Sequence, residues 1–319
     1  MRRWATRRSN VISARNYPSS GLEFRRPLPG VDDCHLRGRE GWLEQTGVGV
    51  VGAEEGRDIA QSRRNIHSTN EFLGVPMSNQ AGDTLITEDR LAHLPESVQR
   101  YMRWTDVVGK PWIRTAYVRQ DGRFRLGADK PWMPMKAEQV YTIDPLAMQW
   151  RARFKMFGLP LFTASDNYRN GEGQMFGKAA GLFTLFDARG EKITLGTLTR
   201  LLSEMIWFPI AYLGDNITWT AVDDHSADVA LTDHGRTASG RMFFDEQGRF
   251  VTFEAMRYKE DDGQYRLLPW HTPATEWGER GGLKLPVRGE VYWVMPEGNL
   301  TYGEFNIVAV EYNRSGNTL

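Results

Sequence analysis

The sequence predicts a mainly β protein of the α+β class. We expect a strongly curved antiparallel sheet, a half-barrel or open barrel, wrapped around one central apolar helix, with a short N-terminal helix. Short segments of alternating apolar and polar residues recur about every 8–12 residues between tight turns, which is typical of antiparallel β-structure. One segment, residues 194–213, is instead apolar at helical spacing. A helix this apolar must be buried on most sides, and a curved sheet can enclose it.

The charge balance of the chain limits its partners. Its 319 residues include 40 basic and 40 acidic side chains, so no overall field attracts nucleic acid, and we expect no nucleic-acid partner. The single cysteine, Cys34, cannot form an internal disulfide. No apolar run approaches the roughly 18 residues that span a bilayer, and the first residues lack the apolar core of a signal peptide. These features predict a cytoplasmic protein with no integral membrane segment and leave its oligomeric state open.

Residues 1–76 differ in composition from the rest of the chain. Arginine is frequent, lysine is absent, and no helical or strand period is visible, so we expect an Arg-rich disordered tail. Two other interpretations stay open: a targeting segment, because several arginines precede the first acid, Glu23, or a start assigned too early. The last is favoured, because Met77 leads directly into sequence with structural patterns. One folded domain is expected over residues 87–313.

The first predicted element of this domain is a short helix over residues 95–104. Pro95 suits a first helical turn, and Val98, Tyr101 and Met102 share one apolar face.

Predicted strands follow on both sides of the central helix. Asp121-Gly122 is interpreted as a hairpin turn, and so is the glycine-containing stretch 233–235. The clearest strand is 147–157, where Trp150 belongs to the apolar series and Arg151 to the polar one. The predicted strands are residues 112–118, 123–126, 137–143, 147–157, 161–168, 174–178, 182–187, 217–222, 227–232, 236–244, 249–258, 265–270, 275–279, 287–294 and 304–312.

The central helix, residues 194–213, carries two charges among its apolar residues. Pro209 should bend or end it, and Gly214 is expected to form a left-handed cap. Arg200 and Glu204 are four residues apart, so they can pair on one face of the helix. The apolar positions are Leu198, Leu201, Leu202, Met205, Ile206 and Phe208.

Several separated motifs, in order along residues 90–313, resemble an uncharacterised bacterial family described only as a domain of unknown function. They include LPESVQRYMR, WRARFKM, DNYRNGEGQM, SEMIWFP, WTAVDD, LLPWHTP and LPVRGEVYW. This resemblance implies no activity. The expected architecture is also similar to the half-barrels of lipoprotein carriers, whose curved sheet wraps helices and holds acyl chains.

Motifs of the common enzyme classes are missing from the sequence. There is no nucleophile elbow and no phosphate loop with its lysine, and Gly171-Glu172-Gly173 is interpreted as a turn between strands. A metal site at 223–225 and 233–234, where Asp and His residues lie one hairpin apart, is chemically sensible. Such residues are far commoner in exposed turns, so we expect no metal and no cofactor.

Glu204 is the candidate catalytic residue. A carboxylate on a buried apolar helix is costly unless it is paired, so the simplest interpretation is an ion pair or hydrogen bond with Arg200 or an inward strand residue. The alternative is a polar anchor in an apolar cavity or a general acid/base, acting with Asp187, Arg151 or His271.

The candidate ligand-binding residues are mostly aromatic. They are expected to line a cavity between sheet and helix or, alternatively, to form an ordinary core. Trp132 lies in a proline-rich loop, 130–134, and Trp270 before Pro273; each is expected either to close the mouth of the barrel over a ligand at its rim or to plug the core. The full set is Trp150, Phe154, Glu204, Trp207, Tyr212, Trp219, Trp132 and Trp270.

Three functions therefore remain open. The preferred hypothesis is a binding protein for an apolar small molecule or a lipid, rather than an enzyme. The others are an enzyme that uses Glu204 and a protein with a filled core that acts through its surface.

Overall fold

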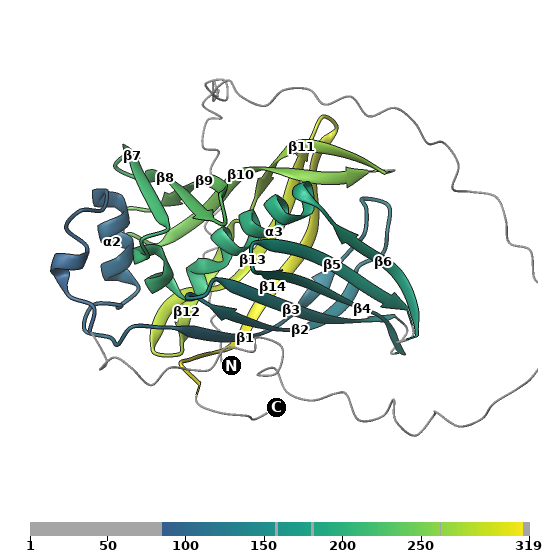
Figure 1. Cartoon of the computed structure of the whole chain (residues 1–319), viewed down its shortest axis with the longest axis horizontal. Helices are drawn as coiled ribbons and strands as arrows, with labels where there is room; N and C mark the ends of the chain where they lie inside the picture. Colours follow the sequence, from purple (N-terminus) through teal and green to yellow (C-terminus); the bar gives the residue numbers. More distant parts are fainter. Residues whose placement is uncertain (1–84, 157–158, 180–181, 262, 315–319) are drawn as a thin grey trace, which may run out of the picture. The chain divides into compact units, whose positions relative to one another are not determined.

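The computed structural model describes residues 85–156, 159–179, 182–261 and 263–314 (Figure 1). All of them belong to one unit of the chain, Gln61–Leu319. The tail predicted over residues 1–76 lies outside the described residues.

A single antiparallel sheet of fourteen strands makes up most of the described residues, which confirms the predicted fold class. The strand order is β6-β5-β4-β3-β2-β1-β14-β13-β11-β10-β9-β8-β7, and β12 pairs with β13 beside this path. The strands are β1 (Thr115–Phe124), β2 (Met133–Thr142), β3 (Ala147–Met156), β4 (Leu159–Arg169), β5 (Glu172–Ala179), β6 (Phe183–Arg189), β7 (Ile217–Asp223), β8 (Ser226–Asp233), β9 (Arg236–Phe244), β10 (Phe250–Asp261), β11 (Gln264–His271), β12 (Ala274–Arg280), β13 (Leu283–Met295) and β14 (Gly298–Tyr312).

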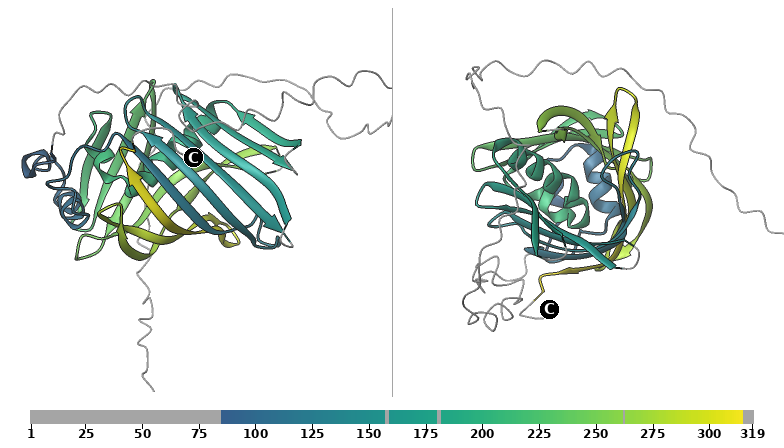
Figure 2. Two further views of the ribbon diagram at one scale, coloured as in Figure 1. Left: turned by 90° about the horizontal axis from the view of Figure 1, so that it is seen from below. Right: turned by 90° about the vertical axis from the view of Figure 1, so that its right-hand side faces the viewer.

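The central helix lies inside the curve of the sheet (Figure 2). It consists of α3 (Glu191–Glu204), followed by the 3-10 turns η2 (Met205–Trp207) and η3 (Pro209–Leu213). From Ile193 to Glu204 every residue except Leu195 and Arg200 is buried, as the apolar pattern predicts. Among the described residues no helix is long and apolar enough to cross a membrane.

The end of the central helix differs from the prediction in two respects. The α-helical part ends at Glu204, before Pro209, and is continued by 3-10 turns. Gly214 is not a left-handed cap, because its backbone is extended, with φ −72° and ψ 153°. The last turns are 3-10 turns, and the Gly214 N–H bonds to the Ala211 carbonyl. A further turn, in which the Ile217 N–H bonds to the Gly214 carbonyl, leads into β7.

The predicted hairpin at Asp121-Gly122 is wrong. β1 runs through both residues and pairs with β2 on one side and β14 on the other. Gly122 is needed for a different reason: a Cβ at this position would overlap the Glu304 carbonyl oxygen of β14. The glycine therefore marks a close backbone approach inside a strand.

The other predicted elements are present, although some are longer than predicted: β2 begins at Met133 and β14 at Gly298. α2 (Glu96–Trp104) follows a single 3-10 turn, η1 (Glu88–Arg90), and packs near the end of β9, where the Tyr101 and Phe244 rings are 5.2 Å apart. The alternation along β3 is confirmed, with Trp150 buried and Arg151 exposed. Gln149 is the exception: it is buried on the predicted outer side, where its amide donates to Asn167 Oδ1 at 3.2 Å.

Two hairpin turns that are far apart in strand order touch each other beside α3. Asn170-Gly171, between β4 and β5, and His234-Gly235, between β8 and β9, all have positive φ, as tight hairpins require. The Tyr168 hydroxyl donates to Asp233 Oδ2 at 2.6 Å, across the two turns. These contacts join the two ends of the sheet over one side of the helix.

Candidate functional site

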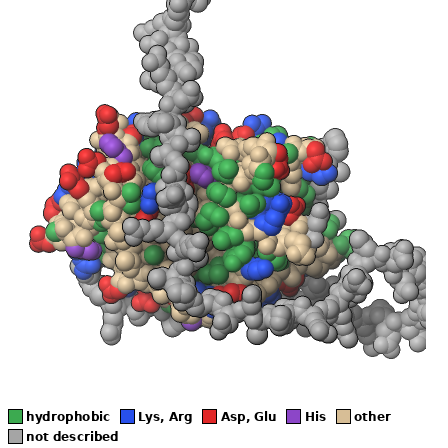
Figure 3. All heavy atoms as spheres, turned by 90° about the horizontal axis from the view of Figure 1, so that it is seen from above, with side chains coloured by type: hydrophobic (Ala, Val, Ile, Leu, Met, Phe, Trp, Pro, Cys, Tyr) green, Lys and Arg blue, Asp and Glu red, His purple; other side chains and the backbone are tan. Residues whose placement is uncertain are grey.

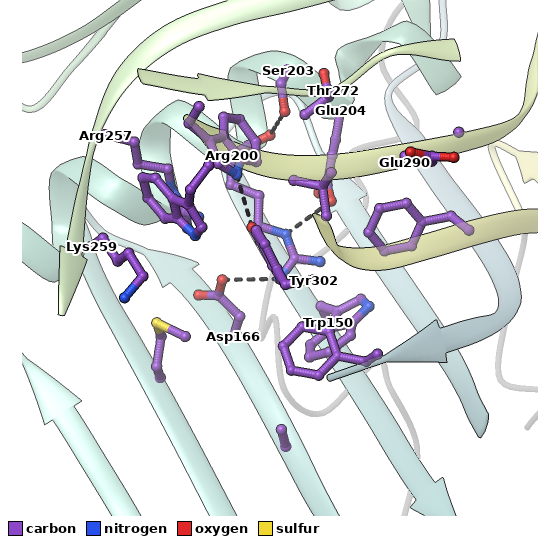
Figure 4. Close-up of a pocket in the computed structure, with 18 of the residues that line it drawn as sticks. Trp150, Asp166, Arg200, Ser203, Glu204, Arg257, Lys259, Thr272, Glu290 and Tyr302 are labelled. Atoms are coloured by element: carbon purple, nitrogen blue, oxygen red, sulfur yellow. Dashed lines mark hydrogen bonds and ion pairs between the residues drawn. The ribbon is translucent and has the colours of Figure 1, made fainter. Parts of the chain in front are cut away.

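A cavity of about 380 Å³ lies between α3 and the inner face of the sheet (Figure 4). Its volume is within the range of roughly 300–1,000 Å³ found for ligand pockets. Most of its wall is aromatic or aliphatic. The main apolar contributors are Phe124, Trp150, Phe154 and Phe162 from β1, β3 and β4, Trp270, Val291, Trp293, Leu300, Tyr302 and Phe305 from β11, β13 and β14, and Ile193, Ile206 and Trp207 from the central helix.

Trp150 and Phe154 of the cavity wall belong to a small apolar cluster separate from the main core. It consists of Met133, Met135, Ala137, Trp150, Ala152 and Phe154, from β2 and β3. The Phe154 ring stacks on Phe162 of β4 with centroids 4.2 Å apart. Inward positions of neighbouring strands thus present ring faces to the space under the helix.

A buried ion-pair cluster holds α3 against β2 and β4. We call it the Arg200 cluster, and its charged members are Arg200, Glu204 and Asp166. Arg200 Nε donates to Glu204 Oε1 at 2.9 Å, and Arg200 Nη1 donates to Asp166 Oδ2 at 3.0 Å. The Asp166 side chain is 1% exposed and the Glu204 side chain 11%. The predicted pairing of Arg200 with Glu204 is confirmed.

Neutral donors complete the Arg200 cluster. The second Glu204 oxygen, Oε2, accepts from Gln139 Nε2 at 2.6 Å and from the Tyr141 hydroxyl at 3.0 Å. Asp166 Oδ1 accepts from Thr197 Oγ1 at 2.9 Å. Each carboxylate oxygen of this cluster therefore has at least one donor, as buried charges require.

The surroundings of the Arg200 cluster shift the pKa values of Arg200 and Tyr141. Burial lowers the pKa of Arg200, but the Glu204 and Asp166 carboxylates raise it more, so the guanidinium stays charged. Burial, followed by the nearby Glu204 carboxylate, raises the pKa of Tyr141 well above its ordinary value, so its hydroxyl stays a donor.

A second arginine of the cavity, Arg257 on β10, has different surroundings. Its Nε donates to the Gly196 carbonyl of α3 at 2.9 Å. Its guanidinium carbon lies 4.8 Å from the Trp270 ring centroid and 5.8 Å from that of Trp293. Among the described residues no carboxylate forms an ion pair with it.

Comparison with known proteins assigns the chain to a family. The model of the family of unknown function DUF6544 matches residues 84–305. This protein belongs to that family. No curated protein matches the sequence.

Two solved structures are similar in fold. A LolA superfamily protein from Nitrosomonas europaea is 11% identical, with a TM-score of 0.39, and the match covers 69% of this chain and 94% of that one. A DUF1329 family protein from Desulfovibrio piger is 9% identical, with a TM-score of 0.34, and covers 69% of this chain and 93% of its own.

Five of the residues proposed from the sequence lie together at the cavity of this DUF6544 protein: Trp150, Phe154, Glu204, Trp207 and Trp270. The other three lie elsewhere. Tyr212 and Trp219 pack against each other, with centroids 5.5 Å apart, at a separate pocket beside His93. Trp132 lies against the guanidinium groups of Arg123 and Arg125, each 4.8 Å from its ring.

The suggested catalytic partners of Glu204 do not converge on it. Asp187 is exposed on β6, where it accepts from Gln174. Arg151 is on the outer face of the sheet. His271 pairs with Glu254 at 3.1 Å and stacks on Tyr292.

The Asp and His residues of the sequence-suggested metal site are also apart. Residues 223–225 precede β8, whereas Asp233 is the last residue of β8 and His234 follows it, so the two groups lie at opposite ends of one strand. At about 3.3 Å per residue, that separation is roughly 20 Å. Over the described ranges there is no group of three or more potential metal ligands.

Sequence reasoning missed Arg257, Tyr302 and Asp166. Arg257 has the same phase as the buried Phe253 and Ala255 in a predicted strand, so period-2 alternation could have found it. Asp166 shares its phase with buried Tyr168. No local signal identifies Tyr302 as part of a site.

Proposed function

We propose that this protein binds an apolar or amphiphilic small molecule, such as a lipid, in the cavity between α3 and the sheet. The observation that carries the proposal is a cavity of about 380 Å³ whose wall is mainly aromatic and aliphatic. Burying apolar ligand surface there would contribute about 0.8 kcal/mol per methylene group.

Apolar surface continues from the cavity to the exterior. Phe186 on β6 and Leu126 after β1 line the cavity and are also 39% and 71% exposed. On the same strand, Phe183 and Leu185 are more than half exposed. Figure 3 shows hydrophobic side chains gathered on one face, with Lys and Arg side chains beside them. Exposed apolar residues at a cavity are typical of an entrance for an apolar ligand.

The two other hypotheses have less support. A general acid or base needs a carboxyl group with a free oxygen in the cavity, whereas both Glu204 oxygens accept hydrogen bonds within the Arg200 cluster. A filled core would leave no space of this size beside the helix.

Native mass spectrometry of the purified full chain tests for a co-purified lipid. A second test fills the cavity: Ala164→Phe, on its wall in β4, should abolish binding of the neutral fluorescent probe N-phenyl-1-naphthylamine. Ser165→Phe, on the outer side of the same strand, is the matched control and should leave binding unchanged. Failure of the wild-type chain to bind the probe, or equal effects of the two substitutions, would contradict the proposal.

A further inference from the structure

We propose that the ligand is an acidic amphiphile and that Arg257 is the anchor for its carboxylate head group. This inference rests on the proposed function, because it names the chemical class of ligand for the same cavity. It follows from comparing the charged groups that face the cavity and the partners that each has.

The carboxylates of the Arg200 cluster are already used. Asp166 and Glu204 together hold Arg200 and accept from Thr197, Gln139 and Tyr141. A cationic ligand would have to displace these short contacts. The cluster therefore offers no free anion to the cavity.

Arg257 is the opposite case. Its Nε donates a hydrogen bond to the Gly196 carbonyl, whereas Nη1 and Nη2 have no hydrogen-bond acceptor among the described residues. The guanidinium is partly buried, and its plane is supported by Trp270 and Trp293. A positioned guanidinium with two unused donor groups matches a carboxylate, which accepts two parallel hydrogen bonds from such a fork.

A neutral donor lies beside Arg257. The Tyr302 hydroxyl accepts from Trp270 Nε1 at 2.8 Å, so its own proton is left to donate into the cavity. Figure 4 places Tyr302 between Arg257 and the Arg200 cluster. Lys259, two residues along β10, also lines the cavity on the same side as Arg257, but its Nζ pairs with Asp261 Oδ1 at 3.6 Å.

The remaining charges at the cavity lie away from this point or have partners. Figure 4 shows Glu290 on the far side of the cavity from Arg257. Arg288 pairs with Glu276 at 3.2 Å. Arg125, next to the exposed Leu126, donates to the carbonyls of Thr301 and Ala128 and stacks on Trp132. Glu260 lies next to Lys259 near the end of β10 and is exposed, so it remains solvated.

The test compares three ligands with one tail: dodecanoic acid, dodecanol and dodecylamine. Each displaces N-phenyl-1-naphthylamine from the delipidated full chain at pH 8, where the acid and the amine are charged. The acid should bind about 10–100-fold more tightly than the alcohol, as expected for a hydrogen-bonded charge pair. Arg257→Gln should remove this preference, lowering the acid's affinity about 10–100-fold more than the alcohol's. Arg241→Gln, on neighbouring β9 and paired with Asp228 away from the cavity, is the matched control.

The outcomes separate the two proposals. If none of the three ligands displaces the probe, the proposed function fails as well. If the acid and the alcohol bind equally, or the amine binds best, the cavity binds apolar ligands but the acidic head group is wrong. An acid preference that persists in Arg257→Gln rules out Arg257 as the anchor. Should that variant not fold, Arg257→Lys replaces it: a reduced acid preference supports the anchor, and an unchanged one overturns it.

Discussion

Two arginines of the same cavity, Arg200 on α3 and Arg257 on β10, have opposite surroundings. Each lies over a tryptophan, Arg200 at 4.5 Å from Trp150 and Arg257 at 4.8 Å from Trp270. Arg200 binds two carboxylates, whereas Arg257 is bound by one backbone carbonyl. The difference teaches that residue type alone does not identify a ligand-binding side chain. The hydrogen-bond and ion-pair partners that the fold gives the side chain identify it.

The energetic consequence differs in the same way. Removing one partner from a buried ion pair leaves an uncompensated charge, which costs about 3–5 kcal/mol. Arg257 is partly exposed and has no carboxylate partner among the described residues. Its removal leaves only one backbone carbonyl without a donor, and water can replace that donor. The Arg200 cluster should therefore determine stability, and Arg257 should determine ligand preference.

The largest expected effect is on the folded state. Arg200→Met leaves Asp166 and Glu204 without their cation and should lower the free energy of unfolding by about 3–5 kcal/mol. Arg257→Met, the matched substitution, should lower it by about 1 kcal/mol or less. Urea denaturation of both variants measures this. Equal losses would show that the two sites do not differ as described.

Glu204→Gln should have an intermediate effect. The neutral amide keeps the shape, but Arg200 loses one of its two carboxylates, and the amide N–H₂ adds a donor among groups that already donate. We expect a loss of about 1–3 kcal/mol in unfolding free energy with no change in probe binding. If stability is unchanged while ligand affinity shifts, Glu204 faces the ligand, and its assignment to the scaffold is wrong.

The smallest effect concerns Tyr141 and alkaline pH. Because its pKa is raised in the folded protein, Tyr141 contributes stability that is present below pH about 10 and lost as pH rises further, when the unfolded chain releases the proton. Tyr141→Phe should lower the unfolding free energy by about 1 kcal/mol at pH 7. Above pH about 10 it should make the decline less steep by up to about 1.4 kcal/mol per pH unit. Denaturation curves at several pH values test this, and an unchanged alkaline slope would contradict the burial of this hydroxyl.

Much of the fold was determined by local patterns in the sequence. Alternation along β3 predicted which side chains face inward, and the apolar period of 194–213 predicted an enclosed helix. The Arg200–Glu204 pair follows from helical spacing alone. Each of these features depends on a few residues that are close in sequence, so it can be predicted from the sequence alone.

The tertiary structure decided what lies across from each of these residues. Asp166 is 34 positions from Arg200, and Gln139 is 65 positions from Glu204, so their contacts depend on strand register and on the curvature of the sheet. The same dependence explains why Asp121-Gly122 continues a strand, since the reason is the backbone of β14. It also explains Arg257: only the folded sheet shows that its guanidinium faces the cavity and that none of the described carboxylates reaches it. Residues far apart in sequence come into contact only when all the strands of the sheet have paired. The spacing of nearby residues therefore does not predict which distant residues will be in contact.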